Sequence, residues 1–403
     1  DFLMNILIIG GGGREHALAW KAAQSPQADV VYVAPGNAGT ALEPGIVNID
    51  IGADDLDALV AFAQERDIGL TIVGPEVPLV AGIVDRFAKS GLPCFGPSGE
   101  AAQLEGSKAF SKDFLARHAI PTAAYATFTE IASACDYIRT QGAPVVVKAD
   151  GLAAGKGVIL AQTEDEAITA VEDMLAGNAF GEAGHRVVIE EFLQGEEASF
   201  IVMADGEHCL PLASSQDHKA RDNGDRGPNT GGMGAYSPAP VVTPAIHQRV
   251  LDEVIMPTIR GMAAEGRPFT GFLYAGLMIA PDGTPRVLEY NVRFGDPETQ
   301  PIMLRLRSDL VGLCLAALDG RLDEVEAEWD ERASLGVVMA AGGYPGAYRS
   351  GDAISGLQDD LDCKVFHAGT RTDGKAVLTS GGRVLCVCAL GEDVAEAQHR
   401  AYD

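Results

Sequence analysis

The sequence has no long hydrophobic run and comparatively few basic residues. No apolar stretch reaches the roughly 18 residues that a membrane-spanning helix requires, so we expect no membrane span. Lysine and arginine number 30 against 57 aspartates and glutamates, which gives a formal net charge of −27. A nucleic-acid partner needs a basic face that neutralises phosphates, and this balance argues against one. A local basic pocket for small phosphates remains compatible with the composition.

Cysteine is also scarce, with 7 residues in a chain of 403. These cysteines are scattered and their number is odd, which favours reduced thiols over a disulfide framework. Cys386 and Cys388 lack the spacing of a CxxC redox or zinc pair and lie in an apolar run that predicts a strand. The N-terminus carries no basic segment typical of an export or organelle signal. These absences together predict a cytoplasmic protein.

The length of the chain predicts two to four domains. Apolar runs and amphipathic segments alternate in residues 5–103, and this βαβαβ pattern predicts a parallel sheet. Predicted strands lie at 6–9, 30–33, 70–73, 186–190, 198–203, 273–279 and 286–289, and predicted helices at 15–24, 56–65, 80–89, 107–119, 164–174 and 393–402. We divide the chain into an N-terminal Rossmann-like domain (1–105), a connecting helix (106–125), a small α+β lid (126–195), a central α+β domain (196–328) and a small C-terminal β-rich domain (329–403).

A glycine-rich loop that contains Lys156 lies between two apolar runs within residues 144–160. A P-loop would require glycine at Asp150 and a hydroxyl residue at Gly157, so the Walker motif is absent. What remains is a hairpin whose backbone N–H groups and lysine can close over a triphosphate. By itself the pattern is equally typical of a plain glycine-rich turn.

Four glycines, residues 10–13, follow the first predicted strand and open a helix. Such a helix N-terminus can receive an anion. The third glycine of a GxGxxG motif would fall on Glu15 or His16, and no acidic residue follows the second strand, which disfavours a nicotinamide cofactor. A sugar phosphate assisted by Arg14 fits better, with a plain strand-to-helix turn as the alternative. Glu76 follows the third strand and can accept hydrogen bonds from sugar hydroxyls or cap the next helix.

Two further strand ends favour nucleotide binding. The apolar run 187–190 enters an acidic turn, where backbone groups can pair with an adenine edge, although a solvated turn is the simpler reading. Glu289 and Asn291 are two residues apart on a predicted strand, so they share one face and offer the hard oxygen ligands that Mg²⁺ accepts beside phosphates. Arg293 continues that face and can stabilise a transferring phosphoryl group. A polar edge strand is the alternative.

Lys108, Lys148, the glycine-rich hairpin, residues 190–193 and the Glu289/Asn291 pair, in this order, resemble the ATP-grasp carboxylate–amine ligases. Within that superfamily the chain is similar to the phosphoribosylamine–glycine ligase family over essentially all of its length. The strings that carry this resemblance most specifically are residues 12–18, 216–219, 227–236 and 293–301. Members of the family often have asparagine where Gly11 stands, and they usually extend past Asp403, so we expect the C-terminal domain to be truncated at its end.

The resemblance implies both a fold and a reaction. The fold is α/β with ATP-grasp architecture: an N-terminal Rossmann-like parallel-sheet domain, a small α+β lid, a central α+β domain and a small C-terminal β-rich domain. The reaction joins glycine to 5-phospho-β-D-ribosylamine through a glycyl phosphate, and gives N1-(5-phospho-β-D-ribosyl)glycinamide, ADP and phosphate in the second step of purine biosynthesis. ATP is the cosubstrate, with one or two Mg²⁺ or Mn²⁺ ions. The resemblance implies a cytoplasmic monomer whose partners are small molecules, with neither nucleic acid nor membrane.

The resemblance also assigns site residues. It implies that Lys148, Lys156 and Arg293 are catalytic and that Glu289 and Asn291 hold the metal. The implied ATP-binding residues are Lys108, Lys148, Gly151, Gly155, Lys156, Gly157, Glu190, Glu191, Phe192, Leu193 and Glu197. The implied substrate-binding residues are Gly12, Gly13, Arg14, Glu76, Asp217, Lys219, Asn229, Thr230, Gly231, Arg293, Asp296, Pro297 and Glu298.

Three alternatives stay open at this point. The nearest is another ATP-grasp carboxylate–amine ligase of nucleotide metabolism, which the strings 227–236 and 293–301 disfavour. An NAD(P)-dependent dehydrogenase is disfavoured by the broken GxGxxG motif. A non-catalytic nucleotide-binding or regulatory protein is disfavoured because the residues expected to carry the chemistry are all present: Lys148, Lys156, Glu289, Asn291 and Arg293.

We expect Lys156→Ala to keep the fold and to raise the KM for ATP strongly, because the hairpin would lose the positive charge that faces the triphosphate. Initial rates at varied ATP concentration measure this effect, and circular dichroism checks the fold. An unchanged KM for ATP would remove the role assigned to the loop.

Overall fold

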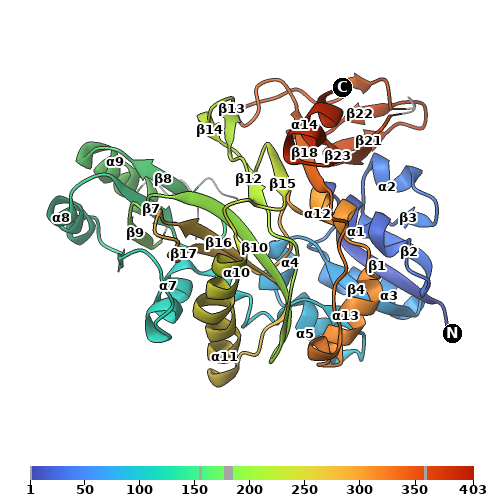
Figure 1. The fold of residues 1–403 in the computed structure, drawn as a ribbon, viewed down its shortest axis with the longest axis horizontal. Coiled ribbons are helices and arrows are strands. Elements are labelled where there is room, and N and C mark those ends of the chain that lie inside the picture. Colours follow the sequence, from blue (N-terminus) through green and yellow to red (C-terminus); the bar gives the residue numbers. More distant parts are fainter. Residues whose placement is uncertain (1, 154–156, 177–184, 358–360) are drawn as a thin grey trace.

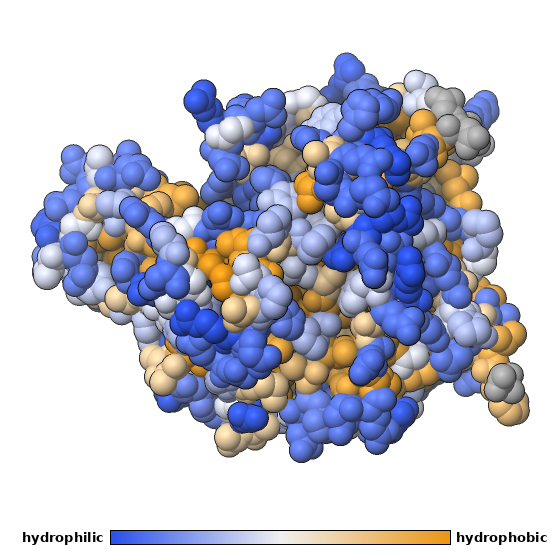
Figure 2. Space-filling model, in the orientation of Figure 1, coloured by the Kyte–Doolittle hydropathy of each residue, from blue (hydrophilic) through white to orange (hydrophobic). Residues whose placement is uncertain are grey.

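The structure, a computed structural model, describes residues 2–153, 157–176, 185–357 and 361–403. Figure 1 shows the N-terminal part at the right, the C-terminal part above it, and a smaller lobe that projects at the left beyond the central strands. Most of the face seen in Figure 2 is hydrophilic, in keeping with the net charge of −27. None of the helices in the described residues has the length and apolar character needed to cross a membrane.

The N-terminal part is the predicted parallel sheet. Its strands are β1 (Met4–Gly10), β2 (Ala28–Pro35), β3 (Ile46–Asn48), β4 (Ile68–Val73) and β5 (Cys94–Phe95), in the order β3-β2-β1-β4-β5. All of their pairings are parallel. Alternate residues of β1 pack into two different cores, because Ile6 and Ile8 face one side and Leu7 and Ile9 the other. Burial on both faces explains why this strand is a continuous apolar run.

Five helices surround this sheet in the described residues: α1 (Gly13–Ala22), α2 (Ala38–Leu42), α3 (Leu56–Glu65), α4 (Glu76–Val80) and α5 (Ile83–Lys89). The helix predicted at 56–65 is confirmed. The helix predicted at 80–89 begins only at Ile83, because Gly82 has a φ of +90° that interrupts the helical backbone. Glycine adopts this conformation readily and other residues rarely do.

The projecting lobe is the predicted lid and has a core of its own. It comprises β6 (Tyr125–Phe128), α8 (Ile131–Gln141), β7 (Val145–Ala149), β8 (Val158–Ala161), α9 (Glu164–Leu175) and β9 (Val187–Glu191). Its antiparallel sheet has the order β6-β9-β7-β8, and α8 and α9 pack on it through Ile138 and Val171. Strands β7 and β8 pair on either side of the glycine-rich loop, with Lys148 opposite Val158. The short helices α6 (Gln103–Gly106) and α7 (Lys108–Arg117) connect the lobe to the N-terminal part.

The central part is a second antiparallel sheet that shares its core with the N-terminal sheet. Its strands are β10 (Glu196–Asp205), β11 (Cys209–Pro211), β16 (Thr270–Ile279) and β17 (Pro285–Asn291), in the order β11-β10-β16-β17. The helical segments of residues 196–328 are α10 (Pro244–Val250), η2 (Leu251–Ile255) and α11 (Met256–Ala264), which precede β16, and α12 (Thr299–Arg305), α13 (Leu310–Leu318) and η3 (Leu322–Glu324), which come after β17. Phe272 packs edge-to-face on Phe95 at 4.9 Å and contacts Phe294 at 4.7 Å between ring centroids. These aromatic contacts fix β17 relative to the parallel sheet.

The C-terminal sheet combines strands from distant parts of the chain. It contains β12 (Gln216–Asp217), β15 (Gly234–Ser237), β18 (Ala333–Ala340), β23 (Arg383–Gly391) and β20 (Lys364–His367), in that order. The remaining elements here are β13 (Ala220–Asp222), β14 (Arg226–Asn229), β19 (Ala353–Ile354), β21 (Thr370–Thr372), β22 (Val377–Thr379) and α14 (Val394–Tyr402). The predicted regions 196–328 and 329–403 thus share one sheet, and the domain boundaries stay a prediction.

Candidate active site

Lysines of the lid and of α7 converge on one buried carboxylate. Lys148 Nζ on β7 lies 2.5 Å from Glu190 Oε2 and donates to the Leu288 carbonyl at 3.1 Å. Lys112 Nζ on α7 lies 3.0 Å from Glu190 Oε1. Burial opposes the charge of Glu190, but the two lysines outweigh it and hold its pKa below the ordinary value. Glu190 therefore fixes the position of Lys148 beside β17.

Asp150 ties the start of the glycine-rich loop to the start of α7. Its Oδ1 accepts hydrogen bonds from Ala109 N at 3.1 Å and Ser107 Oγ at 3.2 Å, and its Oδ2 lies 2.8 Å from Arg186 Nη2. Lys108 Nζ donates to the Gly151 carbonyl at 2.8 Å. The loop is thus anchored at one end by a helix N-terminus and by a lysine.

Two of the predicted ATP-binding residues, Gly155 and Lys156, lie outside the described residues. Gly157, at the other end of the loop, is described. A Cβ there would lie 2.8 Å from the Ala153 Cβ and 3.1 Å from the Ala149 Cβ, so a side chain would force the loop to move. The close approach of the two ends of the loop accounts for this glycine.

The predicted adenine segment lines a hollow. Residues 191–193 bound a pocket of about 280 Å³ together with Gln194, Met278, Ala280 and Arg286. Apolar and polar atoms both face this pocket, as a site for a nucleobase requires. The Glu191 side chain accepts a hydrogen bond from Ala124 N at 3.2 Å, so the backbone of this segment is held against the first strand of the lid.

Opposite charges alternate around Glu289. Lys219 Nζ lies 3.7 Å from Glu289 Oε1 and 3.8 Å from Glu197 Oε2. Burial opposes the charge of Glu289, but Lys219, Lys148 and Lys108 outweigh it and lower its pKa. Burial also opposes the charge of Lys219. The surrounding carboxylates outweigh burial and raise the pKa of Lys219, and Glu289 has the largest effect among them. Glu289 is therefore an ionised oxygen donor in a half-buried position.

Arg293 links the end of β17 to the N-terminal part. Its Nε donates to Glu76 Oε2 at 3.3 Å, and its Nη2 donates to Asn291 Oδ1 at 3.2 Å. The same Nη2 lies 3.5 Å from Glu105 Oε2, while Glu105 Oε1 accepts from Val292 N at 2.8 Å. Two predicted substrate residues and a predicted metal ligand are thus brought together, and Glu105 joins them.

The charges in this cluster shift several pKa values. Burial raises the pKa of Glu105 to about 7, against the opposing effect of Arg293. Burial and the negative charge of Asp217 raise the pKa of Glu298 to about 8. For Glu76 burial acts in the same direction, but Arg293 and Arg14 outweigh it and its pKa is lowered. Carboxyl groups of unequal acidity thus surround one guanidinium group.

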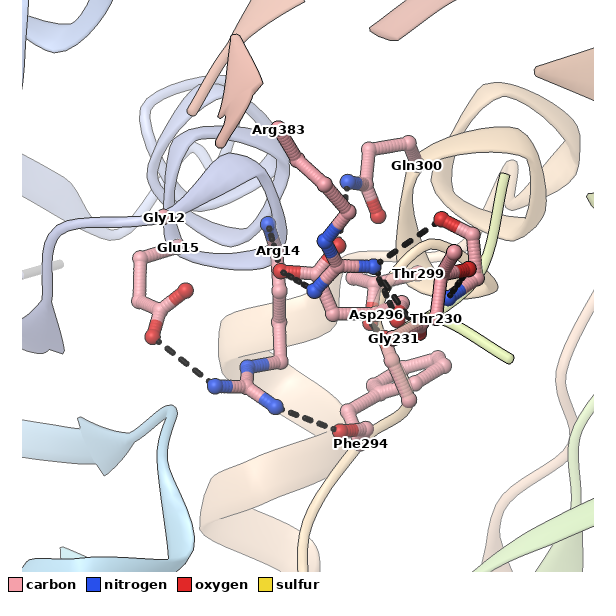
Figure 3. A network of polar contacts seen from close by, with 12 residues as sticks. Gly12, Arg14, Glu15, Thr230, Gly231, Phe294, Asp296, Thr299, Gln300 and Arg383 are labelled. Carbon is pink, nitrogen blue, oxygen red and sulfur yellow. Dashed lines mark hydrogen bonds and ion pairs between the residues drawn. The ribbon is translucent and has the colours of Figure 1, made fainter. Parts of the chain in front are cut away.

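The N-terminus of α1 already receives an anionic group from the chain itself. Arg14 N donates to Asp296 Oδ2 at 3.4 Å, and Gln300 Nε2 donates to Asp296 Oδ1 at 2.9 Å (Figure 3). The Arg14 guanidinium turns away from the glycine loop and contacts the Phe294 carbonyl and the Glu15 carboxylate, each at 3.1 Å. Asp296 therefore caps the helix end that the sequence assigns to a sugar phosphate.

The segment 229–232 connects this region to the lysine cluster. Thr230 Oγ1 donates to the Lys219 carbonyl at 2.8 Å and accepts from Gly232 N at 3.0 Å. Asn229 is exposed at the end of β14. The turn thereby links the backbone of the Lys219 segment to the loop that carries Asp296.

His218 faces away from the charged cluster. It lines a separate hollow of about 810 Å³ between the β13–β14 hairpin, β15, β18 and α14. Its neighbours Asp217 and Lys219 act on the charged cluster instead. Side chains alternate along an extended segment, so the opposite orientation of His218 follows from the backbone. The geometry gives His218 no part in the chemistry of the cluster.

Family models match three successive parts of the chain. They are described as phosphoribosylglycinamide synthetase N domain (residues 4–105), ATP-grasp (A) domain (residues 106–299) and C domain (residues 334–403). The chain belongs to the phosphoribosylglycinamide synthetase family. Curated relatives named phosphoribosylamine–glycine ligase, from Vibrio vulnificus and Yersinia pestis, are each 70% identical over 402 residues, which cover 99% of this chain and 94% of the relative.

Solved structures give the same result for the fold. A crystal structure of phosphoribosylamine–glycine ligase from Thermotoga maritima matches with a TM-score of 0.85 and 34% identity, over 99% of this chain and 95% of that one. Biotin carboxylase from Campylobacter jejuni in complex with a β-γ-ATP ligand matches with a TM-score of 0.75 at 15% identity, over 99% and 90% of the two chains, which shows a shared fold. The predicted family and the predicted ATP-grasp architecture are confirmed.

Several residues of this synthetase-family site were not found from the sequence. Lys112 lies one helical turn after Lys108, a spacing that indicates a shared helix face. Asp150 could have been identified by its position, because it directly precedes the glycine-rich loop. Glu105 and Arg383 gave no local signal, because each reaches the site only through the packing of distant segments.

Glu105 makes the free energy of unfolding depend on pH. Its pKa is raised from 4.5 to about 7, so the folded chain keeps a proton that the unfolded chain releases. The stability from this group is fully present below the unfolded pKa and is lost as the pH rises through the folded pKa. As the pH rises from about 4.5 to about 7, we expect the free energy of unfolding of the wild type to fall by on the order of 2 kcal/mol relative to that of Glu105→Gln.

Urea unfolding of both proteins at a series of pH values from about 4.5 to about 7 measures this difference. Glu65→Gln on the exposed end of α3 is the matched control. Parallel pH profiles for wild type and Glu105→Gln would contradict the raised pKa.

Proposed function

We propose that this chain is an ATP-dependent ligase that joins glycine to phosphoribosylamine. Its curated relatives at 70% identity carry the name phosphoribosylamine–glycine ligase, and they align with 99% of the chain. The products are N1-(5-phospho-β-D-ribosyl)glycinamide, ADP and phosphate, and the reaction is the second step of purine biosynthesis. One observation supports this proposal most directly: Lys148, Glu289 and Arg293 lie close together at the end of β17. The candidate nucleotide pocket lies on one side of them and α1 on the other.

The chemistry requires activation of a carboxylate. A glycine carboxylate is a poor acylating agent, so its oxygen first attacks the γ-phosphorus of ATP, and ADP leaves. The amine of phosphoribosylamine then attacks the carbonyl carbon of the glycyl phosphate, loses a proton and expels phosphate. No covalent enzyme nucleophile takes part, so the protein contributes positioning and charge compensation.

The proposed roles follow from the positions of the charged side chains. Lys148, held by Glu190, faces the nucleotide side of β17, and Arg293 faces the sugar side. Lys219 lies between the carboxylates of Glu289 and Glu197. Phosphates that enter this region would meet positive groups already fixed by buried partners, which lowers the reorganisation needed during phosphoryl transfer. The other residues of the ATP-binding and substrate-binding sets keep the roles assigned from the sequence as part of this proposal.

We assign Glu289 and Asn291 as ligands of a divalent cation, Mg²⁺ or Mn²⁺. In the part of the chain that the structure describes, no group of three or more His, Cys, Asp or Glu side chains is arranged to hold a metal ion. Mg²⁺ in nucleotide sites usually takes one or two protein oxygens and completes its shell with phosphates and water. An ionised Glu289 and the Asn291 amide oxygen on one face of β17 fit that donor set. A bound ion would neutralise charge on the β- and γ-phosphates.

Location and assembly belong to the same proposal. All seven cysteines are free thiols, which fits a reducing compartment such as the cytoplasm. A monomer without a nucleic-acid partner remains the prediction, and light scattering of the purified protein tests it.

We expect Glu289→Gln to lower turnover by about a hundredfold or more, because the amide keeps the shape but loses the charge that holds the metal. Steady-state rates measure the loss and thermal unfolding measures stability, which should be unimpaired. Glu172→Gln, exposed on α9, is the control. An unfolded Glu289→Gln protein would favour a structural role for this residue.

The proposed reaction is tested by ADP release with ATP, Mg²⁺ and glycine, with and without phosphoribosylamine made in situ from ribose 5-phosphate and ammonia. We expect ADP only with both cosubstrates, and a product mass equal to glycine plus ribosylamine minus water. If ATP binds and no such product forms, the substrate assignment falls, and other amines and carboxylates should be screened.

A further inference from the structure

Arg383, the first residue of β23, reaches from the C-terminal sheet into the site. Its Nη1 donates to the carbonyls of Gly231 at 2.9 Å, Gly232 at 3.3 Å and Asp296 at 2.9 Å. Figure 3 shows this guanidinium between the turn that holds Thr230 and the loop that holds Asp296. A single cationic nitrogen thus fastens two backbone segments to each other.

The glycines of the turn permit this contact. A Cβ at position 231 would lie 3.1 Å from Arg383 Cζ, so a side chain there would push the guanidinium off the backbone. Gly232 has a φ of +120°, and a Cβ there would lie 2.4 Å from Pro297 Cδ. Because residues 231 and 232 have no side chains, Arg383 and Pro297 can pack directly against their backbone.

Asp296 carries the connection on to the N-terminal part. Its Oδ2 accepts from Arg14 N at the start of α1 and lies 3.8 Å from Arg383 Nη2, while its Oδ1 is held by Gln300. Burial opposes the charge of Asp296, but Arg383 and Arg14 outweigh it and lower its pKa. The ionised carboxylate therefore joins α1 of the N-terminal part to α12 and to β23 of the C-terminal sheet.

We propose that Arg383 is a positioning residue of the ligase reaction, which holds residues 230–232 and the Asp296 loop against the first turn of α1. This inference rests on the proposed function, in which those segments bind phosphoribosylamine. Its hydrogen-bond partners all lie in the turn and in the Asp296 loop, and none belongs to the ATP-binding set. The C-terminal domain thereby completes the phosphoribosylamine half of the site.

The role predicts a specific kinetic pattern. Displacement of a substrate-binding segment by about 1 Å lowers the rate by roughly a hundredfold, so we expect Arg383→Ala to lower kcat/KM for phosphoribosylamine by about that factor. The KM for ATP should stay within about twofold of the wild-type value, since Lys148 and Lys112 are held by Glu190 and make no contact with this arginine. Methylguanidinium added to Arg383→Ala should restore part of the rate.

Three variants of this chain make the test. Arg383→Lys should recover part of the activity, because an ammonium group can donate to some of the same carbonyls. Arg371→Ala, which removes an exposed arginine on β21 in a separate three-stranded sheet of the C-terminal part, is the matched control and should behave as wild type. Rates with each of the three substrates, the thermal midpoint and methylguanidinium rescue are measured for every variant.

The outcomes separate the two proposals. If wild type forms the expected product and Arg383→Ala keeps its kcat/KM for phosphoribosylamine, the positioning role is wrong. It is also wrong if all three KM values and the thermal midpoint change together without rescue, because that is the pattern of a purely structural residue. If wild type forms no product, the proposed function itself fails.

Discussion

Arg293 joins segments that are far apart in the chain, and the site depends on the ion pairs that it makes. Its guanidinium contacts Glu76 at the end of the parallel sheet, Glu105 on α6 and Asn291 on β17. The protein is strongly acidic overall, so the anionic groups of the substrates can be bound only where cations are concentrated and fixed. Buried carboxylates fix them, and each carboxylate in turn stays charged or protonated according to the cations beside it.

This arrangement requires the N-terminal sheet and the central sheet to be aligned with each other. The aromatic contacts of Phe272 with Phe95 and Phe294, and a core that includes residues of both sheets, provide the alignment. Arg14, after β1, then contacts Phe294, and Glu76, after β4, contacts Arg293, both just beyond the end of β17. Apolar packing thus sets the distances, and the ion pairs refine them. The lid stands apart because its core is its own, and it reaches the site mainly through Lys148, Glu190 and Asp150.

Confirmation of the family gives weight to this geometry without assigning roles to single residues. The lid lysine, the strand with Glu289 and Asn291, and the glycine turn each come from a different part of the chain. Each is held by contacts that do not involve a ligand, such as Lys148 by Glu190 and the turn by Arg383. A site that is organised in this way spends little free energy on ordering when substrates enter.

The sequence by itself determined the local features. Alternation along β17 placed Glu289 and Asn291 on one face, the apolar run of β1 predicted a strand of a parallel sheet, and the glycine strings marked turns. The periodicity of apolar residues indicates which face of an element is buried, and glycine indicates where the backbone turns or approaches another segment closely. Such features can therefore be predicted from neighbouring residues. Only the tertiary structure decided that Asp296 caps α1, that Glu105 and Arg383 enter the site, and that β12 and β15 join the C-terminal sheet. Those contacts join residues that are far apart in the sequence. The packing of whole sheets decides which residues meet, so the residues next to each partner give no local signal for the contact.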